Sequence, residues 1–460
     1  MSRGSSPDIT CVQPDHFYPT GVQNVRKDDP GTLYDPEQDP FATRGIPVFR
    51  PTMDEFKDFE GYMEKVEVWG RKSGIVKIIP PAEWTKSLPS TLPLLPAIKL
   101  KSPIEQRMEG GSGLFRQQNI EKRKILSVMD WVNMCDRPSL KSPSPNKAVR
   151  GARVNSSETR ALHHNSDVGG GNPESGRPPN LSHSPLDLGS LTLGESAFYG
   201  SFDPHSSWLP PETNPSDYTP EACRNLERNF WRTCGIGTPA WYGADMQGSL
   251  FTDTTTTFNV AHLPSLLTRL KLSKPLPGVN TPYLYFGMWR ATFAWHVEDM
   301  DLYSINYIHW GAPKFWYAVP AERSTAFEGI MRGYFPADTS SCPEFLRHKS
   351  YLASPTLLAE SACRPNVLVQ HEGEFVITFP RGYHAGFNLG LNCAESVNFA
   401  LENWVELGRK AGFCQCVPDS VRIDVDALIA ESAQIHEQEK LGLKRKPPNL
   451  MRRQAQSVNV

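Results

Sequence analysis

The sequence predicts a mainly β fold with flanking helices, an α+β architecture built around a double-sheet jelly roll of the cupin type. Two observations predict it. Between residues 283 and 401, short runs rich in aromatic and β-branched residues alternate with turn residues, which is the pattern of many short strands. On both sides of this region, apolar residues recur at helical spacing instead. A jelly roll of this kind has a mouth into which side chains from distant parts of the sequence converge.

Composition restricts the class of protein. The 460 residues include 41 prolines and are 39% hydrophobic, which predicts a folded body with flexible segments attached. A net charge of −2 gives no global sign of a nucleic-acid binder, so any basic contact must be local. No apolar run reaches about 18 residues, and residues 1–30 lack the apolar core of a signal peptide, so we expect the cytosol or nucleus and no membrane contact. The 9 cysteines are then expected to be thiols or metal ligands.

The N-terminal part of the sequence indicates a disordered segment followed by a small folded unit of strands and a helix. Residues 1–44 are rich in Pro, Asp and Gly and show no periodicity, so we expect them to be disordered. Ile46–Arg50 is predicted as a strand, and Thr52 and Glu55 have capping-box spacing for a helix that follows. Residues 75–79 predict a second strand. The apolar stripe of the expected helix comprises Phe56, Phe59, Met63 and Val66.

A change of composition separates this unit from the second half of the chain. Residues 138–220 are rich in Ser, Pro, Gly, Asn and His, and we interpret them as a long disordered insertion, because apolar patterning resumes at Leu226. Helices are expected around residues 263–270 and 325–334 and after Ile423. The predicted strands are Tyr283–Trp289, Leu302–Trp310, Lys314–Val319, Phe375–Phe379 and Glu395–Leu401.

The residues with the clearest chemistry are His296 and Glu298. Residues two apart on an extended strand point to the same face, so this imidazole and carboxylate project together into one cavity. We propose His384, which follows the Phe379–Tyr383 stretch, as the third ligand of a two-His, one-carboxylate facial triad. This ligand set suits Fe(II), because it leaves coordination positions open for a co-substrate and O2. A His-x-Glu pair alone also occurs by chance, so its context decides.

Lys314 supports this interpretation. It begins a strand of aromatic residues, and a buried lysine there is costly unless it meets an anion such as the dicarboxylate 2-oxoglutarate. The alternative is an exposed lysine at a strand start.

Three stretches together resemble a known family. Residues Asn280–Trp289, the stretch from His296 to Glu298, and Phe379–Phe387 look like the JmjC domain of the JmjN–JmjC histone lysine demethylases. Residues 47–59 resemble their JmjN segment. The resemblance covers about residues 45–130 and 220–425. The insertion between them departs from the animal members, which indicates a fungal-type or divergent member of the family.

The resemblance implies a set of cofactors. Fe(II) would be bound by His296, Glu298 and His384, and would be chelated by 2-oxoglutarate in a reaction that consumes O2. The distal carboxylate of 2-oxoglutarate would be held by Lys314 and Tyr242, with Asn306 close to it, through charge-assisted hydrogen bonds. A structural Zn(II) is also implied. Its ligands would be Cys342, His348, Cys414 and Cys416, a tetrahedral set that would tie the C-terminal element to the barrel.

The resemblance also implies a methyl-lysine pocket. Its members are Gly278, Tyr285, Glu298, Ser396, Val397 and Asn398. Oxygens of such residues attract the polarised methyl groups of a cationic nitrogen through weak C–H···O contacts. Val397 departs from the hydroxyl residue of several family members, which leaves the preference between di- and trimethyl-lysine open. Without the resemblance, Tyr285 would be interpreted as a core aromatic.

The resulting hypothesis is Fe(II)- and 2-oxoglutarate-dependent demethylation of di- or trimethyl-lysine on the histone H3 tail, at lysine nine, lysine thirty-six or both, in the nucleus. A protein hydroxylase and an inactive scaffold that binds chromatin remain as alternatives. Lys444–Lys446 and Arg452–Arg453 form a basic tail that would allow a weak DNA contact or mark nuclear import. The expected segments are a disordered N-terminus (1–44), JmjN (45–90), linker strands (91–137), a disordered insertion (138–220), JmjC (221–405), a zinc-tied element (406–430) and a basic tail (431–460).

Overall fold

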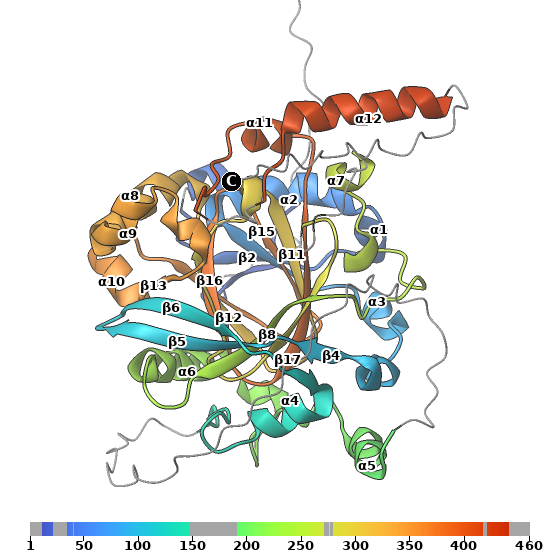
Figure 1. Cartoon of the computed structure of the whole chain (residues 1–460). Helices are drawn as coiled ribbons and strands as arrows, with labels where there is room; N and C mark the ends of the chain where they lie inside the picture. The colour runs from blue at the N-terminus through green and yellow to red at the C-terminus, as the bar shows by residue number, and fades with distance from the viewer. Residues whose placement is uncertain are drawn as a thin grey trace, which may run out of the picture.

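Two large sheets form the centre of the protein (Figure 1), and they confirm the predicted α+β jelly roll. The computed structural model describes residues 12–21, 35–39, 41–146, 191–270, 276, 279–416 and 421–440. The smaller sheet has the order β10 (Thr292–His296), β16 (Tyr383–Asn388), β12 (Lys314–Val319) and β14 (Asn366–Gln370). The larger sheet has the order β1 (His16–Tyr18), β2 (Ile46–Phe49), β3 (Ile75–Ile78), β15 (Phe375–Thr378), β11 (Tyr303–Gly311), β17 (Asn392–Phe399), β9 (Tyr283–Gly287), β8 (Ala240–Gln247), β5 (Ile104–Gly111), β6 (Leu114–Glu121) and β13 (Tyr351–Ala353). A separate small sheet pairs β4 (Lys99–Lys101) with β7 (Ile125–Ser127).

Helices cover the outside of this barrel (Figure 1). The α-helices are α1 (Met53–Phe56), α2 (Phe59–Ser73), α3 (Ala82–Ser87), α4 (Val128–Cys135), α5 (Leu193–Ser201), α6 (Pro220–Thr233), α7 (Leu266–Arg269), α8 (Ser324–Tyr334), α9 (Pro336–Ser341), α10 (Pro355–Glu360), α11 (Trp404–Gly408) and α12 (Val425–Lys440). Short 3-10 helices are η1 (Pro36–Gln38), η2 (Leu92–Ala97), η4 (Pro215–Asp217), η5 (Val260–His262), η6 (Asp299–Asp301), η7 (Ala321–Arg323) and η8 (Phe345–His348). None of the described helices combines the length and apolar character that a bilayer-crossing segment needs.

Alternation along the central strands separates the cavity from a second core. On β11, Ser304 and Asn306 face the interior of the jelly roll. Their neighbours Ile305 and Tyr307 point to the other face, where they pack in an apolar cluster that includes Phe59 of α2. Side chains at i and i+2 of a strand share a face, so one strand serves a polar cavity and an apolar core together.

The predicted N-terminal helix is divided in two. The capping box of Thr52 and Glu55 is present, but α1 ends at Phe56 after a single turn. Asp58 then caps α2, because its carboxylate accepts the Gly61 N–H at 3.1 Å. The expected apolar stripe is nevertheless continuous: Phe56, Phe59, Met63 and Val66 all lie in one buried cluster.

The expectation of disorder is wrong wherever the structure describes residues 138–220. Phe202 packs on Trp310 with ring centroids 6.1 Å apart, and Trp208 and Tyr218 pack together at 4.9 Å. These aromatic residues are buried, so residues 191–220 gain the apolar contacts that their average composition concealed. Residues 147–190 of the expected insertion lie outside the described residues.

The structure also differs from the predicted segments at the two ends of the chain. Residues 16–18 form β1, whose Phe17 is buried, although residues 1–44 were expected to be disordered. Helix α12 continues to Lys440, inside the expected basic tail, and lies across one end of the barrel (Figure 1). The basic clusters at 444–446 and 452–453 are outside the described residues.

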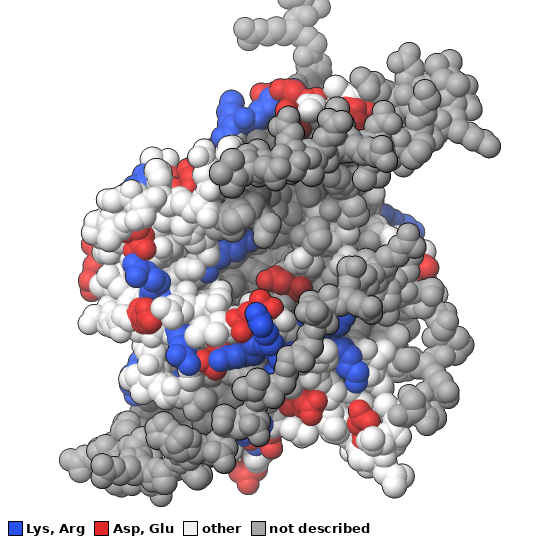
Figure 2. Space-filling model, viewed as in Figure 1, with Lys and Arg blue, Asp and Glu red and all other residues white. Residues whose placement is uncertain are grey.

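Charges of both signs are mixed on the face shown in Figure 2. Over β5 and β6, Lys and Arg side chains lie beside Asp and Glu side chains. Glu105 pairs with both Arg107 and Lys122, and Arg116 pairs with Asp338. Such exposed pairs contribute little stability and leave little net charge at this place.

Candidate active site and metal centres

The structure brings His296, Glu298 and His384 together. His296 ends β10, and Glu298 follows two residues later with an extended backbone. His384 lies on the neighbouring strand β16 with its Cα directly opposite that of His296. One ligand atom from each residue lies within 4.8 Å of the others, and His384 Nε2 is 3.4 Å from Glu298 Oε1. The cluster can therefore hold one metal ion, as the sequence predicted.

Hydrogen bonds to the backbone fix both imidazoles. Nδ1 of His296 lies 2.7 Å from the Ala294 carbonyl, and Nδ1 of His384 lies 3.0 Å from the Gly382 carbonyl. A carbonyl only accepts, so each Nδ1 carries the proton and each Nε2 is left with its lone pair toward the cavity. Burial lowers the pKa of His296 well below its usual range, which keeps this ring neutral as a metal ligand must be.

Glu298 is ionised despite its position. Burial by itself raises the pKa of this carboxyl, but its contact with His384 and the positive charge of Lys349 outweigh burial and hold the pKa well below its usual range. The cluster therefore offers two neutral nitrogens and one anionic oxygen, which is a donor set for Fe(II) with positions left open.

A cavity of about 350 Å³ adjoins this cluster. Lys314 lines it and is only 1% exposed. Its Nζ donates to Asn388 Oδ1 at 2.8 Å and to the Tyr242 hydroxyl at 3.2 Å, and both partners are neutral. Burial lowers the pKa of Lys314 to about 7, and among the described residues no carboxylate pairs with it. The side chain Oδ1 of Asn306, on the same cavity, is buried without a hydrogen-bond partner.

These features fit an anionic co-substrate. A buried ammonium without a counter-ion is costly, and a carboxylate beside it would offset the cost of its burial. The hydroxyl of Tyr242 can donate to the same carboxylate. The three residues predicted to hold 2-oxoglutarate, Tyr242, Asn306 and Lys314, all line this one cavity.

Sequence reasoning missed Asn388. Its Cα lies opposite that of Lys314 in the pairing of β12 with β16. Its amide oxygen accepts from Lys314, and its Nδ2 donates to the Ala291 carbonyl at 2.9 Å. Only the register of the two strands reveals this partner, because 74 positions separate the residues in the chain.

Three of the predicted pocket residues line the same cavity beside Glu298. They are Tyr285, Ser396 and Asn398. Tyr285 is hydrogen-bonded to Asp245, and burial followed by the Asp245 charge raises its pKa well above the usual value. The phenol therefore stays protonated and donates to Asp245, which leaves its oxygen lone pairs for other contacts. Gly278 lies outside the described residues.

The assignment of Val397 to this pocket is wrong. Val397 packs in the apolar cluster on the other face of β17, opposite Ile305 of β11. Ser396 and Asn398, its two neighbours, face the cavity. The reason is the two-residue period of a strand, which sends consecutive side chains to opposite faces. Whether residue 397 is valine or a hydroxyl residue therefore does not change the number of oxygens in the cavity.

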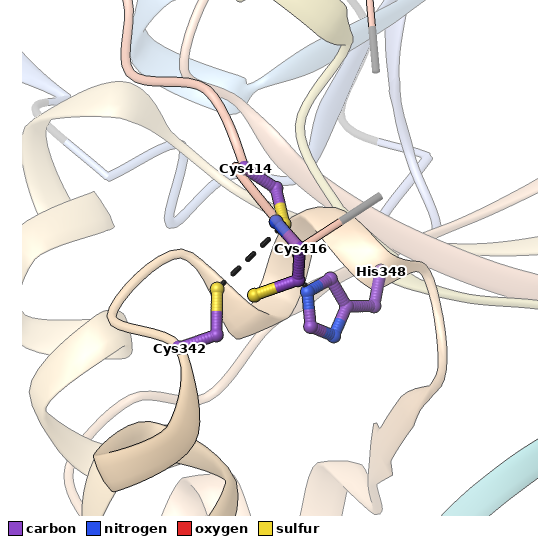
Figure 3. A group of neighbouring side chains, drawn as sticks. All are labelled: Cys342, His348, Cys414 and Cys416. Carbon is purple, nitrogen blue, oxygen red and sulfur yellow. Dashed lines mark hydrogen bonds between the residues drawn. The ribbon is translucent and has the colours of Figure 1, made fainter. Parts of the chain in front are cut away.

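A second cluster, of three cysteines and one histidine, lies where the sequence predicted it (Figure 3). Cys342 follows α9 and His348 ends η8, whereas Cys414 and Cys416 come from the segment after α11. The side chains converge: Sγ of Cys342 is 3.7 Å from Sγ of Cys414, and Nε2 of His348 is 3.0 Å from the same sulfur. Three sulfurs and one imidazole within 4.8 Å of one another fit a tetrahedral zinc ion.

Lys349 connects the two clusters and was missed in the sequence. It directly follows His348, and its backbone is left-handed with φ of 54°. Its side chain lines the cavity of Glu298, with Nζ 3.7 Å from Asp299 Oδ2. The left-handed turn after His348 therefore places a cation in the lining of the cavity, one residue from the Cys/His cluster.

Helix α2 holds the turn that presents His384. The Phe379 N–H donates to the Gly74 carbonyl at 3.1 Å, beyond the end of α2. The Phe379 ring packs on Gly70 so closely that a Cβ added there would lie 2.0 Å from a ring carbon. A Cβ on Gly382 would meet the Gly74 carbonyl oxygen at 2.7 Å. The N-terminal unit thus contacts the segment whose Gly382 carbonyl orients His384.

Comparison with known families identifies the class. Residues 283–399 match the family described as "JmjC domain, hydroxylase", and residues 47–80 match the jmjN domain. The chain is therefore a JmjN plus JmjC domain protein, which confirms the resemblance. Its His/Glu/His cluster and Lys314 lie inside the JmjC match.

Within this class, the chain is related to the lysine-specific demethylases 4. It is 36% identical over 387 residues to lysine-specific demethylase 4B of Mus musculus, which covers 84% of this chain and 28% of that protein. It is 34% identical over 387 residues to probable lysine-specific demethylase 4F of Homo sapiens and to lysine-specific demethylase 4D of Rattus norvegicus, covering 48% and 60% of their lengths. The chain thus spans between 28% and 60% of these curated relatives.

Proposed function

We propose that this protein is an Fe(II)- and 2-oxoglutarate-dependent demethylase of di- and trimethyl-lysine on the histone H3 tail, at lysine nine, lysine thirty-six or both. The observation that carries the proposal is the pairing of two features in one cavity: a His/Glu/His cluster and a buried lysine without an anion. The relatives named as lysine-specific demethylases support methylated lysine as the substrate class.

Each group of the cavity has a role in this proposal. His296, Glu298 and His384 would hold the iron, whose chemistry with 2-oxoglutarate and O2 oxidises an N-methyl group and yields succinate, CO2 and formaldehyde. Lys314 and Tyr242 would bind the distal carboxylate of the co-substrate, and Asn306 lines the cavity beside them. Burial of Lys314 excludes water from this end of the cavity, so the carboxylate is held by fixed donors.

The methylated lysine would enter between Tyr285, Ser396 and Asn398. All three carry oxygens, and all line the cavity of Glu298. Oxygens attract polarised N-methyl hydrogens without requiring an N–H donor, so the pocket would be able to accept a trimethylated nitrogen. The Tyr285 hydroxyl is held in place by Asp245, which orients the phenol oxygen.

The Cys/His cluster would bind a structural zinc ion through Cys342, His348, Cys414 and Cys416. The ion would join the segment after α11 to the barrel, and it would thereby hold Lys349 at the cavity. We further propose that the protein acts on chromatin in the nucleus, with the histone H3 tail as its partner.

Mass spectrometry of H3 peptides tests the reaction. The purified protein with Fe(II), 2-oxoglutarate and ascorbate is incubated with peptides that carry mono-, di- or trimethyl-lysine. Loss of methyl groups together with formaldehyde supports demethylation. A hydroxyl group retained on another side chain would support the hydroxylase that the family description also names. Absence of succinate with every peptide would support an inactive scaffold.

A further inference from the structure

A second groove lies on the reverse side of the four-stranded sheet from the metal cavity. On β12, Lys314 and Trp316 face the cavity, whereas the Tyr317 hydroxyl points outward to α6 and bonds Glu227 at 2.8 Å and Trp231 at 2.7 Å. The groove has a volume of about 1000 Å³ and is bounded by α6, α10 and the turn between β5 and β6. It shares no lining residue with the metal cavity.

Arginines dominate the charge of this groove, which we call the arginine groove. Arg224, Arg228 and Arg232 recur every four residues along α6, and Arg364 faces the groove from the segment between α10 and β14. Arg224 is paired with Glu227 at 3.1 Å. The described part of the chain provides no carboxylate partner for the other three, since Arg228 contacts only the amide of Asn225.

The two carboxylates of the groove do not cancel this charge. Glu227 is only 6% exposed and is already engaged by Arg224 and by the Tyr317 hydroxyl. Glu360, at the end of α10, is the other acidic residue of the lining. Four guanidinium groups against two carboxylates leave a net charge of +2 (4 − 2).

The spacing and type of these cations fit a phosphate backbone. Four residues of an α-helix rise about 6 Å, so the three arginines of α6 form a row roughly 12 Å long that is inclined to the helix axis. Guanidinium groups bind phosphate oxygens through two parallel hydrogen bonds, and the basic residues lining this groove are all arginines. Pro355, Leu357 and Val367 also line the groove, so an acidic peptide is the competing occupant that the test below must distinguish. In this groove the one aromatic residue, Trp231, already donates its N–H to Tyr317.

We propose that the arginine groove binds the phosphate backbone of duplex DNA. The relevance of this contact to nucleosomal substrates rests on the proposed function, but the contact itself does not. The groove is separate from the metal cavity, so DNA bound there would leave the cavity open to a peptide. The protein would then gain affinity for a histone tail that is presented beside DNA.

Fluorescence anisotropy with a labelled duplex of arbitrary sequence tests the contact. The whole chain is titrated at several salt concentrations. The variant Arg228→Glu/Arg232→Glu is compared with Lys86→Glu/Lys101→Glu, which reverses two exposed lysines outside the groove. We expect the groove variant to lose about tenfold or more in affinity, and its salt dependence to fall by about two phosphate contacts. The control should stay within about twofold of the original protein.

Two further measurements separate the possible failures. Arg228 and Arg232 are both exposed, so an unchanged melting temperature of the variant excludes unfolding. Turnover of a methylated H3 peptide should be unchanged by the double substitution, whereas turnover of nucleosomes should fall. Equal loss of DNA binding in both variants would overturn the proposal, because it would indicate that the overall charge of the protein, and not the groove, attracts DNA. The proposal would also be overturned if polyglutamate bound the groove and DNA did not. If no peptide is demethylated, the binding data still decide the DNA contact.

Discussion

Replacing Lys314 by methionine should stabilise the protein and abolish co-substrate binding together. Lys314 is fully enclosed and bonded only to the neutral Asn388 and Tyr242. Methionine has a similar length and brings no charge into this site. If the lysine is kept in order to bind an anion, its presence must reduce stability whenever the anion is absent.

The magnitude follows from the pKa. Burial lowers the pKa of Lys314 from 10.5 to about 7. A difference of roughly 3.5 units corresponds to about 5 kcal/mol as an upper limit, at about 1.4 kcal/mol per unit. The loss of two hydrogen bonds offsets roughly 2 kcal/mol of this gain. Asn388 Oδ1 keeps its bond from Asn392 at 2.9 Å, so it is not left unsatisfied. We therefore expect a net gain of about 2–3 kcal/mol near pH 6.

The gain should depend on pH in one direction. Below pH 7 the lysine is charged in both the folded and the unfolded protein, so the whole cost of burial is present. Between about 7 and 10.5 only the unfolded protein binds the proton, so the original protein becomes more stable as the pH rises. The advantage of the methionine variant should shrink across this interval. Equilibrium denaturation at pH 6, 8 and 10 measures it, and calorimetric titration measures 2-oxoglutarate binding.

Lys77→Met is the matched control. Lys77 is also buried, at 5% exposed, but it pairs with Glu374 at 2.9 Å. Its removal leaves the buried Glu374 carboxylate without its cation, with only the His371 N–H among the described residues still bonded to it, which costs about 3–5 kcal/mol. The two buried lysines should therefore respond in opposite directions. A Lys314→Met protein that is less stable than the original at pH 6, or that still binds 2-oxoglutarate, would refute the reasoning.

Three further predictions concern the metal centres. His296→Ala should abolish turnover with an unchanged melting temperature, and retained turnover would contradict its role as a ligand. Gly70→Ala should cost about 1–3 kcal/mol by overpacking against Phe379. It should also weaken Co(II) binding measured by absorption, whereas Gly329→Ala, with nothing within 4 Å, should leave binding unchanged. Cys414→Ala should release zinc and lower the melting temperature, and an unchanged melting curve with a chelator present would argue against a zinc site.

Local patterns allowed much of the architecture to be predicted. The strand Lys314–Val319 has the predicted bounds, and the capping box at Thr52 and Glu55 is present. Both depend on near neighbours in the chain: alternating side chains in one case and hydrogen bonds three residues apart in the other. The same alternation should have excluded Val397 from the pocket, because Ser396 and Asn398 already occupied its inner face.

Composition gave a wrong prediction of disorder where the order of a segment depends on contacts with distant parts of the chain. Residues 191–220 have the polar, Pro-rich character of a disordered segment, but Phe202 and Trp208 are buried there. Phe202 finds its partner, Trp310, more than a hundred positions away. A few aromatic residues can order a polar segment when a surface exists to receive them, and composition contains no information about that surface.

The sequence by itself determined which residues to examine for chemistry: His296 and Glu298 from their two-residue spacing, and Lys314 from its place at the start of an aromatic strand, all of which the structure gathers in one cavity. Only the tertiary structure decided their surroundings. It placed Asn388 opposite Lys314, brought Lys349 to the cavity beside His348, and set the turn before His384 against α2. The physical reason is that these contacts depend on strand register and close packing, which arise when segments far apart in the chain meet.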